Sequence, residues 1–289
     1  MAGADAAVTL TARVHKVVLE DGGTAARKIA APNAPVTREA VVLRFLHSRG
    51  CPVPRVLAAD ETTLLTEWAG DVTLDDALQE GGDVDGGALL AAVRSVSDAL
   101  ASATTVKPGA AEALAADLRR WTAALPDALG WLGLGPVPTL LGPVAERALE
   151  CAPRPGSLDY NARNVVLSPS GPVLIDFSAV GYDWDERRAA QYALSAGADR
   201  PDGTFRSALT EVVVKGAWDA EGIDAHEVVL LAIAVEQLRQ VATGSARRER
   251  AAAWGGVERR RESLLRLLAR PLCADGPAAV LRAAIAARS

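Results

Sequence analysis

The chain has 289 residues, of which 49% are hydrophobic, so it is long enough to bury the core of one large or two modest domains. Its net charge of −5 argues against general nucleic-acid binding. The three cysteines lie far apart and the three histidines show no metal-ligand spacing, so the sequence indicates neither a disulfide framework nor a zinc site. Without a signal-peptide pattern or an apolar run long enough to span a membrane, we expect a soluble cytoplasmic protein.

Three short strands and one helix are predicted at the N-terminus. Gly22-Gly23 marks a hairpin turn between the second and third strands. The helix follows from a stripe of apolar residues at helical spacing, with Thr37 as its expected N-cap and Gly50 just past its end. The predicted strands cover residues 7–12, 14–19 and 24–30, and the predicted helix covers residues 37–49.

Lys28 and Glu39 are the charged residues of interest in this part of the chain. Lys28 lies in the third strand and is one of only four lysines, against 27 arginines. Glu39 lies eleven residues later, in the first turn of the helix, and this separation allows the two side chains to meet. Each also has a purely structural interpretation. An exposed lysine is normal on an edge strand, and a carboxylate in a first helical turn favours the helix dipole.

Residues 53–70 predict a second pair of strands. The sequence V-P-R-V-L, an acidic turn and then L-L-T-E-W precede Gly70. From about residue 71 the pattern becomes helical, with two apolar faces, and Pro126 is expected to break the second of these helices. The first face consists of Leu89, Leu90, Val93, Val96 and Leu100. Further helices are predicted at residues 144–151, 204–217, 225–243, 257–269 and 278–287.

The stretch from Gly156 to Gly181, GSLDYNARNVVLSPSGPVLIDFSAVG, carries the polar residues on which the functional interpretation depends. Asn164 opens an apolar run, Asp176 closes another, and the turn sequence S-P-S-G-P between them predicts a β-hairpin. Asp159 precedes Asn164 by five residues, so all three side chains can face one cleft. An amide and a carboxylate oxygen suit Mg²⁺, and the other carboxylate can accept a hydroxyl proton. Taken singly, Asp159 and Asn164 could also be loop residues that bond their own backbone.

The spacing D-x₄-N followed by L-I-D-F resembles the catalytic and metal loops of the aminoglycoside phosphotransferase and choline kinase-like family, a branch of the protein-kinase-like fold. The order of features over residues 37–78 is similar to that family as well. The resemblance implies an α+β, two-lobed protein-kinase-like fold, with a small antiparallel-sheet N-lobe that has one main helix, and a mostly helical C-lobe. The implied N-terminal nucleotide-binding lobe covers residues 1–70 with a hinge at 66–70, and the implied C-terminal lobe covers residues 71–289 with a catalytic loop at 156–164 and a metal loop at 173–181.

The resemblance also implies a role for each candidate residue. ATP, with GTP as an alternative donor, would bind along the hinge backbone, and Lys28, held by Glu39, would point at its phosphates. Asp159 would accept the proton of the acceptor hydroxyl. The implied set consists of the catalytic residues Asp159 and Asn164, the nucleotide-binding residues Lys28, Glu39, Glu67, Trp68 and Ala69, and the Mg²⁺ ligands Asn164 and Asp176.

Two departures from the family pattern concern the same loops. The family has histidine where Ser157 stands, and no glycine occurs between Ala4 and Asp21, although a phosphate-covering loop is expected at residues 11–15. A hydroxyl can take part of the histidine's place, and backbone N–H groups of other residues can also turn toward phosphate. The departures motivate one alternative function, a pseudokinase that binds nucleotide or a partner without transferring phosphate.

The sequence leaves the acceptor open. One interpretation is an ATP- and Mg²⁺-dependent O-phosphotransferase for an antibiotic, amino alcohol, sugar or nucleoside. Asp183, Asp185 and Glu186 would suit a cationic acceptor if they line its cleft. Another is a Ser/Thr kinase for a natural-product precursor peptide, since residues 247–270 hold eight arginines and three glutamates and can bind an acidic peptide or partner protein. The structural interpretation of that segment is a solvated helix pair.

Overall fold

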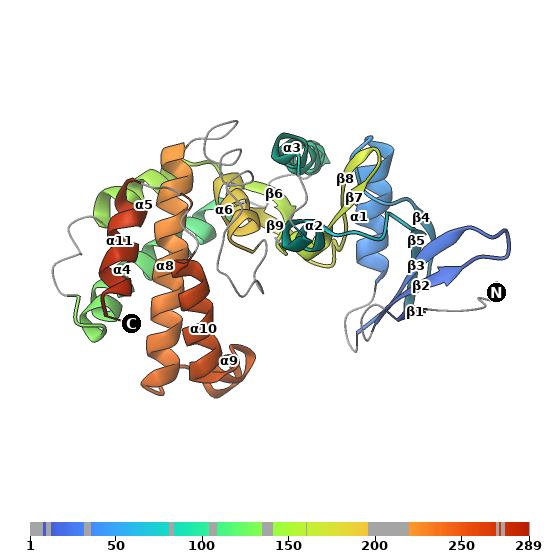
Figure 1. Cartoon of the computed structure of the whole chain (residues 1–289). Helices are drawn as coiled ribbons and strands as arrows, with labels where there is room; N and C mark the ends of the chain where they lie inside the picture. The colour runs from blue at the N-terminus through green and yellow to red at the C-terminus, as the bar shows by residue number, and fades with distance from the viewer. Residues whose placement is uncertain are drawn as a thin grey trace. The chain divides into compact units, whose positions relative to one another are not determined.

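The computed structural model describes residues 8–9, 13–31, 36–80, 84–103, 109–134, 141–159, 161–195, 220–269, 272 and 275–288, and Figure 1 labels most of the helices and strands. The chain divides into two compact units. The first contains residues 1–105 and 155–181, and the second contains residues 106–154 and 182–289. The lobe boundary expected near residue 70 stays a prediction. Within the described ranges, no helix combines the length and the apolar character needed to cross a membrane.

A five-stranded antiparallel sheet in the order β1-β2-β3-β5-β4 belongs to the first unit. Lys28 of β3 pairs with Val14 of β2 on one side and with Leu64 of β5 on the other. Lys28 therefore lies in a central strand, which removes the edge-strand interpretation of this residue. The strands are β1 (Val8–Thr9), β2 (Val14–Val18), β3 (Thr24–Ile29), β4 (Val56–Ala59) and β5 (Thr63–Glu67).

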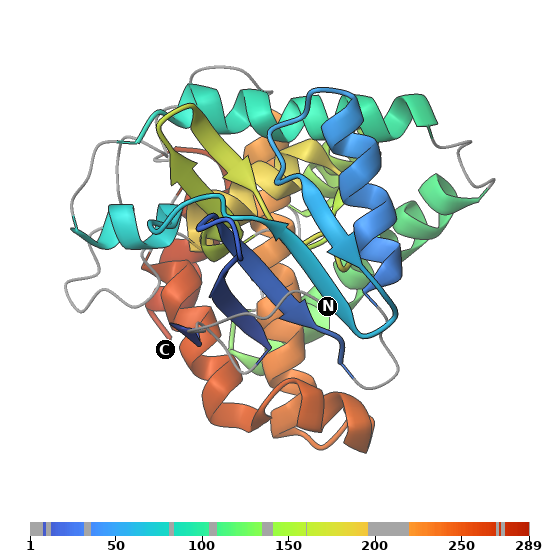
Figure 2. The ribbon, with the colours of Figure 1, turned by 90° about the vertical axis from the view of Figure 1, so that its right-hand side faces the viewer.

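Helix α1 (Thr37–Ser48) lies alongside this sheet in Figures 1 and 2, and its Leu46 is fully buried. The helix ends as predicted, because Gly50 takes the left-handed conformation, φ +75°, that terminates many helices. The predicted N-cap was wrong. Val36 occupies that position without a side-chain hydrogen bond, and Thr37 is already helical. Val36 is only 4% exposed, so packing of an apolar side chain takes the place of a cap here.

The predicted hairpin in the 156–181 stretch is present and is anchored to the rest of the first unit. Leu174 donates its N–H to the carbonyl of Pro52, and Leu167 donates to the carbonyl of Val72, both at 2.9 Å. These bonds connect the hairpin to the segments that follow α1 and β5. Its strands are β7 (Val165–Ser168) and β8 (Gly171–Leu174), and the nearby helices are α2 (Leu74–Glu80) and α3 (Gly86–Ala103).

Close backbone packing at Gly70 completes this connection. Gly70 has φ +149°, and a Cβ at this position would lie 2.9 Å from Cγ1 of Val166. Thr73 forms an isolated antiparallel bridge with the same Val166. The segment after β5 therefore runs against β7 at a distance that only glycine permits. The predicted apolar face of α3 is also confirmed, since Leu89, Leu90, Val93, Val96 and Leu100 are all buried.

Helix α8 (Ala220–Ala242) is the central helix of the second unit. It packs against five other helices of that unit, as the orange helix in Figure 1 shows, and its Leu231 and Val235 are fully buried. Those neighbours are α4 (Ala110–Trp131), α5 (Leu141–Glu150), α6 (Asp185–Ser195), α10 (Gly256–Leu268) and α11 (Pro277–Ala286). Helix α9 (Arg248–Ala253) also belongs to the second unit, and the paired strands β6 (Arg154–Ser157) and β9 (Val180–Asp183) lie at the sequence positions where the chain passes from one unit to the other.

Pro126 does not break α4, contrary to the sequence-based expectation, because the helix continues to Trp131. Ala128 and Leu129, just beyond the proline, are both 0% exposed in the hydrophobic core. Burial of these residues offsets the cost of about 3 kcal/mol that proline carries inside a helix. The helix predicted at 204–217 and most of the strand predicted at 7–12 lie outside the described residues.

Candidate functional site

Lys28, Glu39 and Asp176 meet in the first unit, although they come from β3, α1 and the chain just after β8. The Nζ atom of Lys28 lies 2.8 Å from Oε2 and 3.1 Å from Oε1 of Glu39, and 2.8 Å from Oδ1 of Asp176. The lysine side chain is 19% exposed and the glutamate side chain 5%. One ammonium group therefore bridges two carboxylates in a place largely shielded from water. The spacing in the sequence suggested the pair with Glu39, and the family resemblance implied that Asp176 faces the ammonium of Lys28.

Burial disfavours the charged form of all three residues in this triad. Ion pairs and hydrogen bonds outweigh burial in setting the pKa of Lys28 and of Asp176, but not that of Glu39. Burial disfavours the ammonium, yet Glu39 and Asp176 outweigh it and raise the pKa of Lys28. Burial also disfavours the carboxylate of Asp176, but hydrogen bonds from Lys28 and Ser178 lower its pKa. At Glu39 burial prevails and raises the pKa, although Lys28 opposes the shift. Lys28 is therefore a firmly held positive charge at neutral pH.

The backbone after β8 is shaped around these carboxylates. Asp176 has φ +60°, a left-handed conformation that is uncommon for residues other than glycine. Phe177 donates its N–H to Oε1 of Glu39, and Ser178 donates to Oδ1 of Asp176, both at 3.2 Å. Phe177 is only 1% exposed, so its packing holds this turn in place. Backbone strain of this kind concentrates at functional sites.

Asp159 lies on an exposed loop between β6 and the 3₁₀ helix Ala162–Asn164. Its N–H donates to Oγ of Ser157 at 3.2 Å, so the hydroxyl at the family's histidine position holds the main chain of this loop. Asn161 accepts the N–H of Arg163 and caps the 3₁₀ helix. The backbone of the loop is thus fixed while the Asp159 residue remains accessible.

Asn164 connects the Asp159 loop to the Asp176 segment. Its Nδ2 donates to the carbonyl of Asp159 at 3.4 Å, and its own carbonyl accepts the N–H of Ile175 at 2.9 Å. Asp176 follows Ile175 directly, so the hairpin brings the backbone of Asn164 beside that of Asp176. The two residues with the oxygen donors that suit Mg²⁺ therefore start from neighbouring backbone positions.

The residues predicted to form the hinge lie at the end of β5. The N–H of Glu67 donates to the carbonyl of Arg55 at 2.9 Å, so the sheet uses this group and a nucleotide cannot. Trp68 and Ala69 follow the strand and are half-buried. The ammonium of Lys16 lies 4.6 Å from the centroid of the Trp68 ring, a cation–π contact that the sequence did not reveal.

A partly buried ion pair, which the sequence analysis did not predict, holds the far end of the Asp159 loop. Nε of Arg163 lies 3.0 Å from Oδ2 of Asp75 in α2, and Asp75 is only 3% exposed. The residues beside Asp75 do carry a recognisable sequence pattern for the start of a helix. Thr73 and Asp76 exchange hydrogen bonds as a capping box, which the sequence T-L-D-D indicates and which fixes the start of α2. The pairing of Asp75 with Arg163, 88 residues later, has no comparable local pattern in the sequence.

No protein-family model matches this sequence, and no curated protein matches it significantly. Solved structures do match. A choline/ethanolamine kinase family protein from Mesorhizobium loti has a TM-score of 0.56 at 16% identity, covering 98% of this chain and 92% of that one. A thermostable mutant of aminoglycoside phosphotransferase APH(4)-Ia, in a ternary complex with AMP-PNP and hygromycin B, has a TM-score of 0.53 at 16% identity, covering 92% and 95%. The ADP-bound aminoglycoside phosphotransferase APH(2'')-Ib has a TM-score of 0.50 at 12% identity, covering 90% and 91%.

The fold is that of aminoglycoside phosphotransferases and choline kinase-like proteins. The predicted fold class, a small antiparallel sheet with one main helix and a mostly helical remainder, is confirmed. Each of these matches covers at least 90% of this chain, so the kinase-like fold accounts for both units and not only for the triad around Lys28.

In the second unit of this kinase-like fold, Asp183 and Asp185 do not offer free carboxylates to a cationic acceptor. They are 4% and 7% exposed. Nη1 of Arg188 lies 2.8 Å from Oδ1 of Asp185, and Nη1 of Arg187 lies 3.6 Å from Oδ1 of Asp183. The condition under which they would suit a cationic acceptor, that they line its cleft, is therefore not met by these two residues, because arginines of α6 neutralise their charges and the surrounding chain buries them.

Proposed function

We propose that the chain is an ATP- and Mg²⁺-dependent O-phosphotransferase that moves the γ-phosphate to a hydroxyl group of a small molecule. The observation that carries the proposal is the ammonium of Lys28, held 2.8 Å from both Glu39 and Asp176. In kinases, a lysine paired with a helix glutamate holds the nucleotide phosphates, and a nearby aspartate binds the metal. The similarity in fold to an AMP-PNP complex and to an ADP complex supports ATP as the donor, with GTP as the alternative.

Lys28 is prepared for an anionic ligand. Glu39 is 4% exposed and receives the N–H of Phe177, so it is held against the lysine. The side chain of Asp176 is 32% exposed and has more freedom to turn away. An ammonium group has three donors, so it can keep Glu39 and give the donor that Asp176 uses to a phosphate oxygen. We expect nucleotide binding to exchange Asp176 for phosphate while the Glu39 pair persists.

Asn164 and Asp176 are the proposed Mg²⁺ ligands. Amide and carboxylate oxygens are hard donors of the type that Mg²⁺ prefers, and the lowered pKa of Asp176 keeps its carboxylate ionised. The hydrogen bond from Ile175 to the carbonyl of Asn164 holds the two backbone segments together. When bound, the ion would neutralise charge on the β- and γ-phosphates.

Asp159 is the proposed general base. Its residue is exposed, while Ser157 and Asn164 hold its backbone through the N–H and the carbonyl. The carboxylate would accept the acceptor's hydroxyl proton as that oxygen bonds to the γ-phosphorus, and the bond from the γ-phosphorus to the departing ADP oxygen would break. Catalysis would then rest on positioning and charge neutralisation.

A small hydroxyl-bearing molecule is the proposed acceptor. The structures similar in fold include a complex with hygromycin B and a choline/ethanolamine kinase family protein. Antibiotics, amino alcohols, sugars and nucleosides all carry the required hydroxyl. Since ATP is supplied in the cytoplasm, we propose that compartment as the place of the reaction.

Thermal stabilisation by ATP tests the nucleotide site without knowledge of the acceptor. We expect ATP with Mg²⁺ to raise the Tm of the wild type and to lose this effect in Lys28→Ala and Asp176→Ala. Arg44→Ala, which removes an exposed positive charge from α1, should keep the shift. A folded wild type that shows no shift with ATP would contradict the proposal. Stabilisation by ATP without ADP release for any acceptor, small molecule or peptide, would favour the pseudokinase alternative.

Exposed arginines on α9 and α10 support a second candidate, a Ser/Thr kinase for an acidic precursor peptide. Salt and charge reversal at Arg259 and Arg261 should both weaken the binding of such a peptide. Arg119→Glu, which reverses an exposed charge on α4, should leave the binding unchanged. Equal binding by all three variants would contradict this candidate. Within the described part of residues 247–270, the exposed arginines are Arg247, Arg248, Arg250, Arg259, Arg261 and Arg266.

A further inference from the structure

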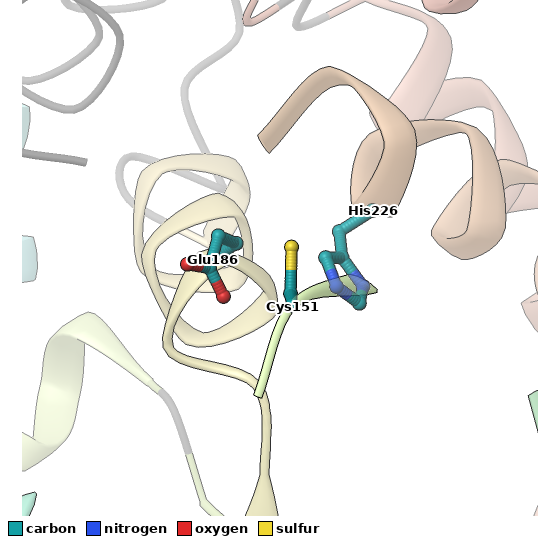
Figure 3. Close-up of side chains that lie close together, drawn as sticks. All are labelled: Cys151, Glu186 and His226. Atoms are coloured by element: carbon teal, nitrogen blue, oxygen red, sulfur yellow. The ribbon is translucent and has the colours of Figure 1, made fainter. Parts of the chain in front are cut away.

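A cysteine, a glutamate and a histidine from three elements of the second unit meet (Figure 3). Cys151 follows α5, Glu186 lies in the first turn of α6, and His226 lies in α8. One potential ligand atom from each, the Cys151 sulfur, a Glu186 carboxylate oxygen and a His226 ring nitrogen, lies within 4.8 Å of the other two. Among the residues whose placement is described, no other three side chains of these metal-binding types come as close.

We propose that these three residues, the Cys151–Glu186–His226 site, bind a divalent transition metal ion, and that Zn²⁺ is the ion that suits them best. Thiolate, imidazole and carboxylate are the three side-chain ligand types found on zinc. Zinc bonds of about 2.0–2.3 Å in a tetrahedral arrangement place ligand atoms about 3.4–3.6 Å apart. Small rotations of the side chains, which shorten the longest separation by about 1 Å, therefore suffice to bring the three ligands onto one ion, with a water molecule as the fourth ligand.

His226 is the ligand best prepared for a metal. It is 0% exposed, and neither ring nitrogen makes a hydrogen bond of standard geometry within the described part of the chain, although the backbone of Ala148 lies close enough to favour the protonated ring. A buried imidazole in this condition loses most of the hydrogen bonding it had in water, a cost that a bound ion would reduce. Burial first, and then the charge of Arg187, lower the pKa of His226 to about 3. The ring is therefore neutral at physiological pH, which is the form that binds metals.

Cys151 and Glu186 supply the negative charge. Cys151 is 8% exposed, and its sulfur lies 3.7 Å from the carbonyl of Arg147. Burial first, and then the carboxylate of Glu186, raise the pKa of the thiol to about 11, so the thiol is protonated while no cation is present. A thiolate and a carboxylate together balance the two charges of Zn²⁺, and binding would release the thiol proton. Two arginine charges nearby oppose a cation, and each has an acidic partner. That of Arg187 lies 3.6 Å from the carboxylate of Asp183, and that of Arg147 lies 3.0 Å from the carboxylate of Glu150.

A metal at this position would connect three elements that are distant in the sequence. The ligands are separated by 35 and 40 residues, so the ion would close two long loops and restrict the unfolded chain. It would also tie α5 and α6 to α8, the central helix of this unit. An ion that binds only the folded chain stabilises it by mass action. The site is therefore proposed as structural, and it is independent of the phosphotransferase proposal.

Cobalt substitution in the full chain tests the proposal. Metal-free protein is prepared with a chelator and titrated with Co²⁺, and Zn²⁺ is added afterwards. We expect a near-ultraviolet thiolate-to-cobalt absorption band that saturates at one ion per chain and that Zn²⁺ displaces, together with a Tm that Zn²⁺ raises. A titration of the folded wild type without this band would overturn the proposal.

The assignment of the ligands rests on matched variants. Cys151→Ser should lose the band, while Cys51→Ser, which removes a buried thiol of the first unit that contacts Ser95, should keep it. Both variants are made in a Cys273→Ser background so that the remaining thiol cannot contribute. His226→Gln and Glu186→Gln should each weaken Zn²⁺ binding by about tenfold or more. An unchanged band in folded Cys151→Ser would overturn the proposal. If a variant does not fold, a zinc-dependent Tm of the wild type supports the proposal and a zinc-independent one contradicts it.

Discussion

Arg163 in the Asp159 loop forms an ion pair with Asp75, with 3.0 Å between Nε and Oδ2. The two side chains differ in environment, since that of Arg163 is 57% exposed and that of Asp75 only 4%. Gln79 donates a second hydrogen bond to the same carboxylate oxygen at 3.0 Å. Water screens the arginine, so the pair matters chiefly because it satisfies the buried carboxylate.

This asymmetry predicts unequal effects of the two neutralising substitutions. Arg163→Gln removes a cation from beside a buried carboxylate and should lower the free energy of unfolding by about 1–3 kcal/mol. Asp75→Asn removes the buried charge itself and should cost less. Urea unfolding of both variants, with Arg119→Gln as the control for an exposed arginine, measures the difference. Equal losses of unfolding free energy in Arg163→Gln and Asp75→Asn would show that the buried carboxylate does not determine the cost of breaking this ion pair.

Asp159→Asn should lower turnover by a factor of about 10² or more, the usual effect of losing a general base. Its effect on the ATP-induced rise in Tm should be small, because Asp159 is proposed to contact the acceptor and not the nucleotide. ADP release under single-turnover conditions measures the first effect. Asp21→Asn, which changes an exposed acid in the β2–β3 turn, serves as the control. Full activity of Asp159→Asn would remove Asp159 from the mechanism.

Gly70→Ala should destabilise the chain more than Gly50→Ala. Both glycines have positive φ, +149° and +75°, so an alanine is strained at each position, by about 1–2 kcal/mol. At Gly50 the added methyl group meets no atom within 4 Å, whereas at Gly70 it would lie 2.9 Å from Val166 and 3.3 Å from the carbonyl of Leu167. The clash should add about 1–3 kcal/mol, as overpacking does elsewhere. Thermal and urea unfolding of the two variants measure the cost of this clash. Equal stabilities of Gly70→Ala and Gly50→Ala would show that the clash has no effect.

Asp60 should contribute to stability at neutral pH and lose that contribution in acid. Hydrogen bonds from the backbone and side chain of Thr62 and from the backbone of Thr63 lower its pKa below 3.8. A carboxyl group with a lowered folded-state pKa stabilises the fold above its unfolded pKa and loses this effect as the pH falls through the folded value. Asp60→Asn should therefore be less stable than the wild type at pH 7, with a gap that narrows below about pH 4. Urea unfolding of the wild type and Asp60→Asn at pH 7 and at roughly pH 3 measures the gap, with Glu61→Gln as the control for a change at the adjacent exposed acid.

The parts of the fold that the sequence predicted are those with local signals. Turn residues flanked by apolar runs marked the β7–β8 hairpin, and an apolar stripe marked α3. The spacing between Lys28 and Glu39 also suggested their contact, because only one connection separates strand from helix. Where a distant contact outweighed the local signal, the prediction was wrong. Core burial of Leu129 carries α4 through Pro126, and packing of Val36 removes the expected cap at Thr37.

Contacts between distant segments left no local signal in the sequence, so the approach of Asp176 to Lys28 was expected only from the family resemblance. Asp176 reaches Lys28 across 148 residues, and Arg163 reaches Asp75 across 88. The group formed by Cys151, Glu186 and His226 was excluded as a zinc site on spacing alone. Such spacing rules describe ligands that share one short motif, whereas these three residues come from separate elements.

The division of the first unit into two chain segments bears on how the protein folds as it is made. Asp176 follows Lys28 by 148 residues, and the stretch between them includes residues 106–154 of the second unit, so the ribosome must synthesise it before the third member of the triad exists. At about 5–20 residues per second this delay lasts roughly 7–30 s. During that time α2 and α3, which pack against the β7–β8 hairpin in the folded chain, lack that partner. The first unit can therefore reach its final form only after residue 181 has left the ribosome exit tunnel, and until then the apolar surfaces that the hairpin will cover remain exposed to aggregation and to chaperones.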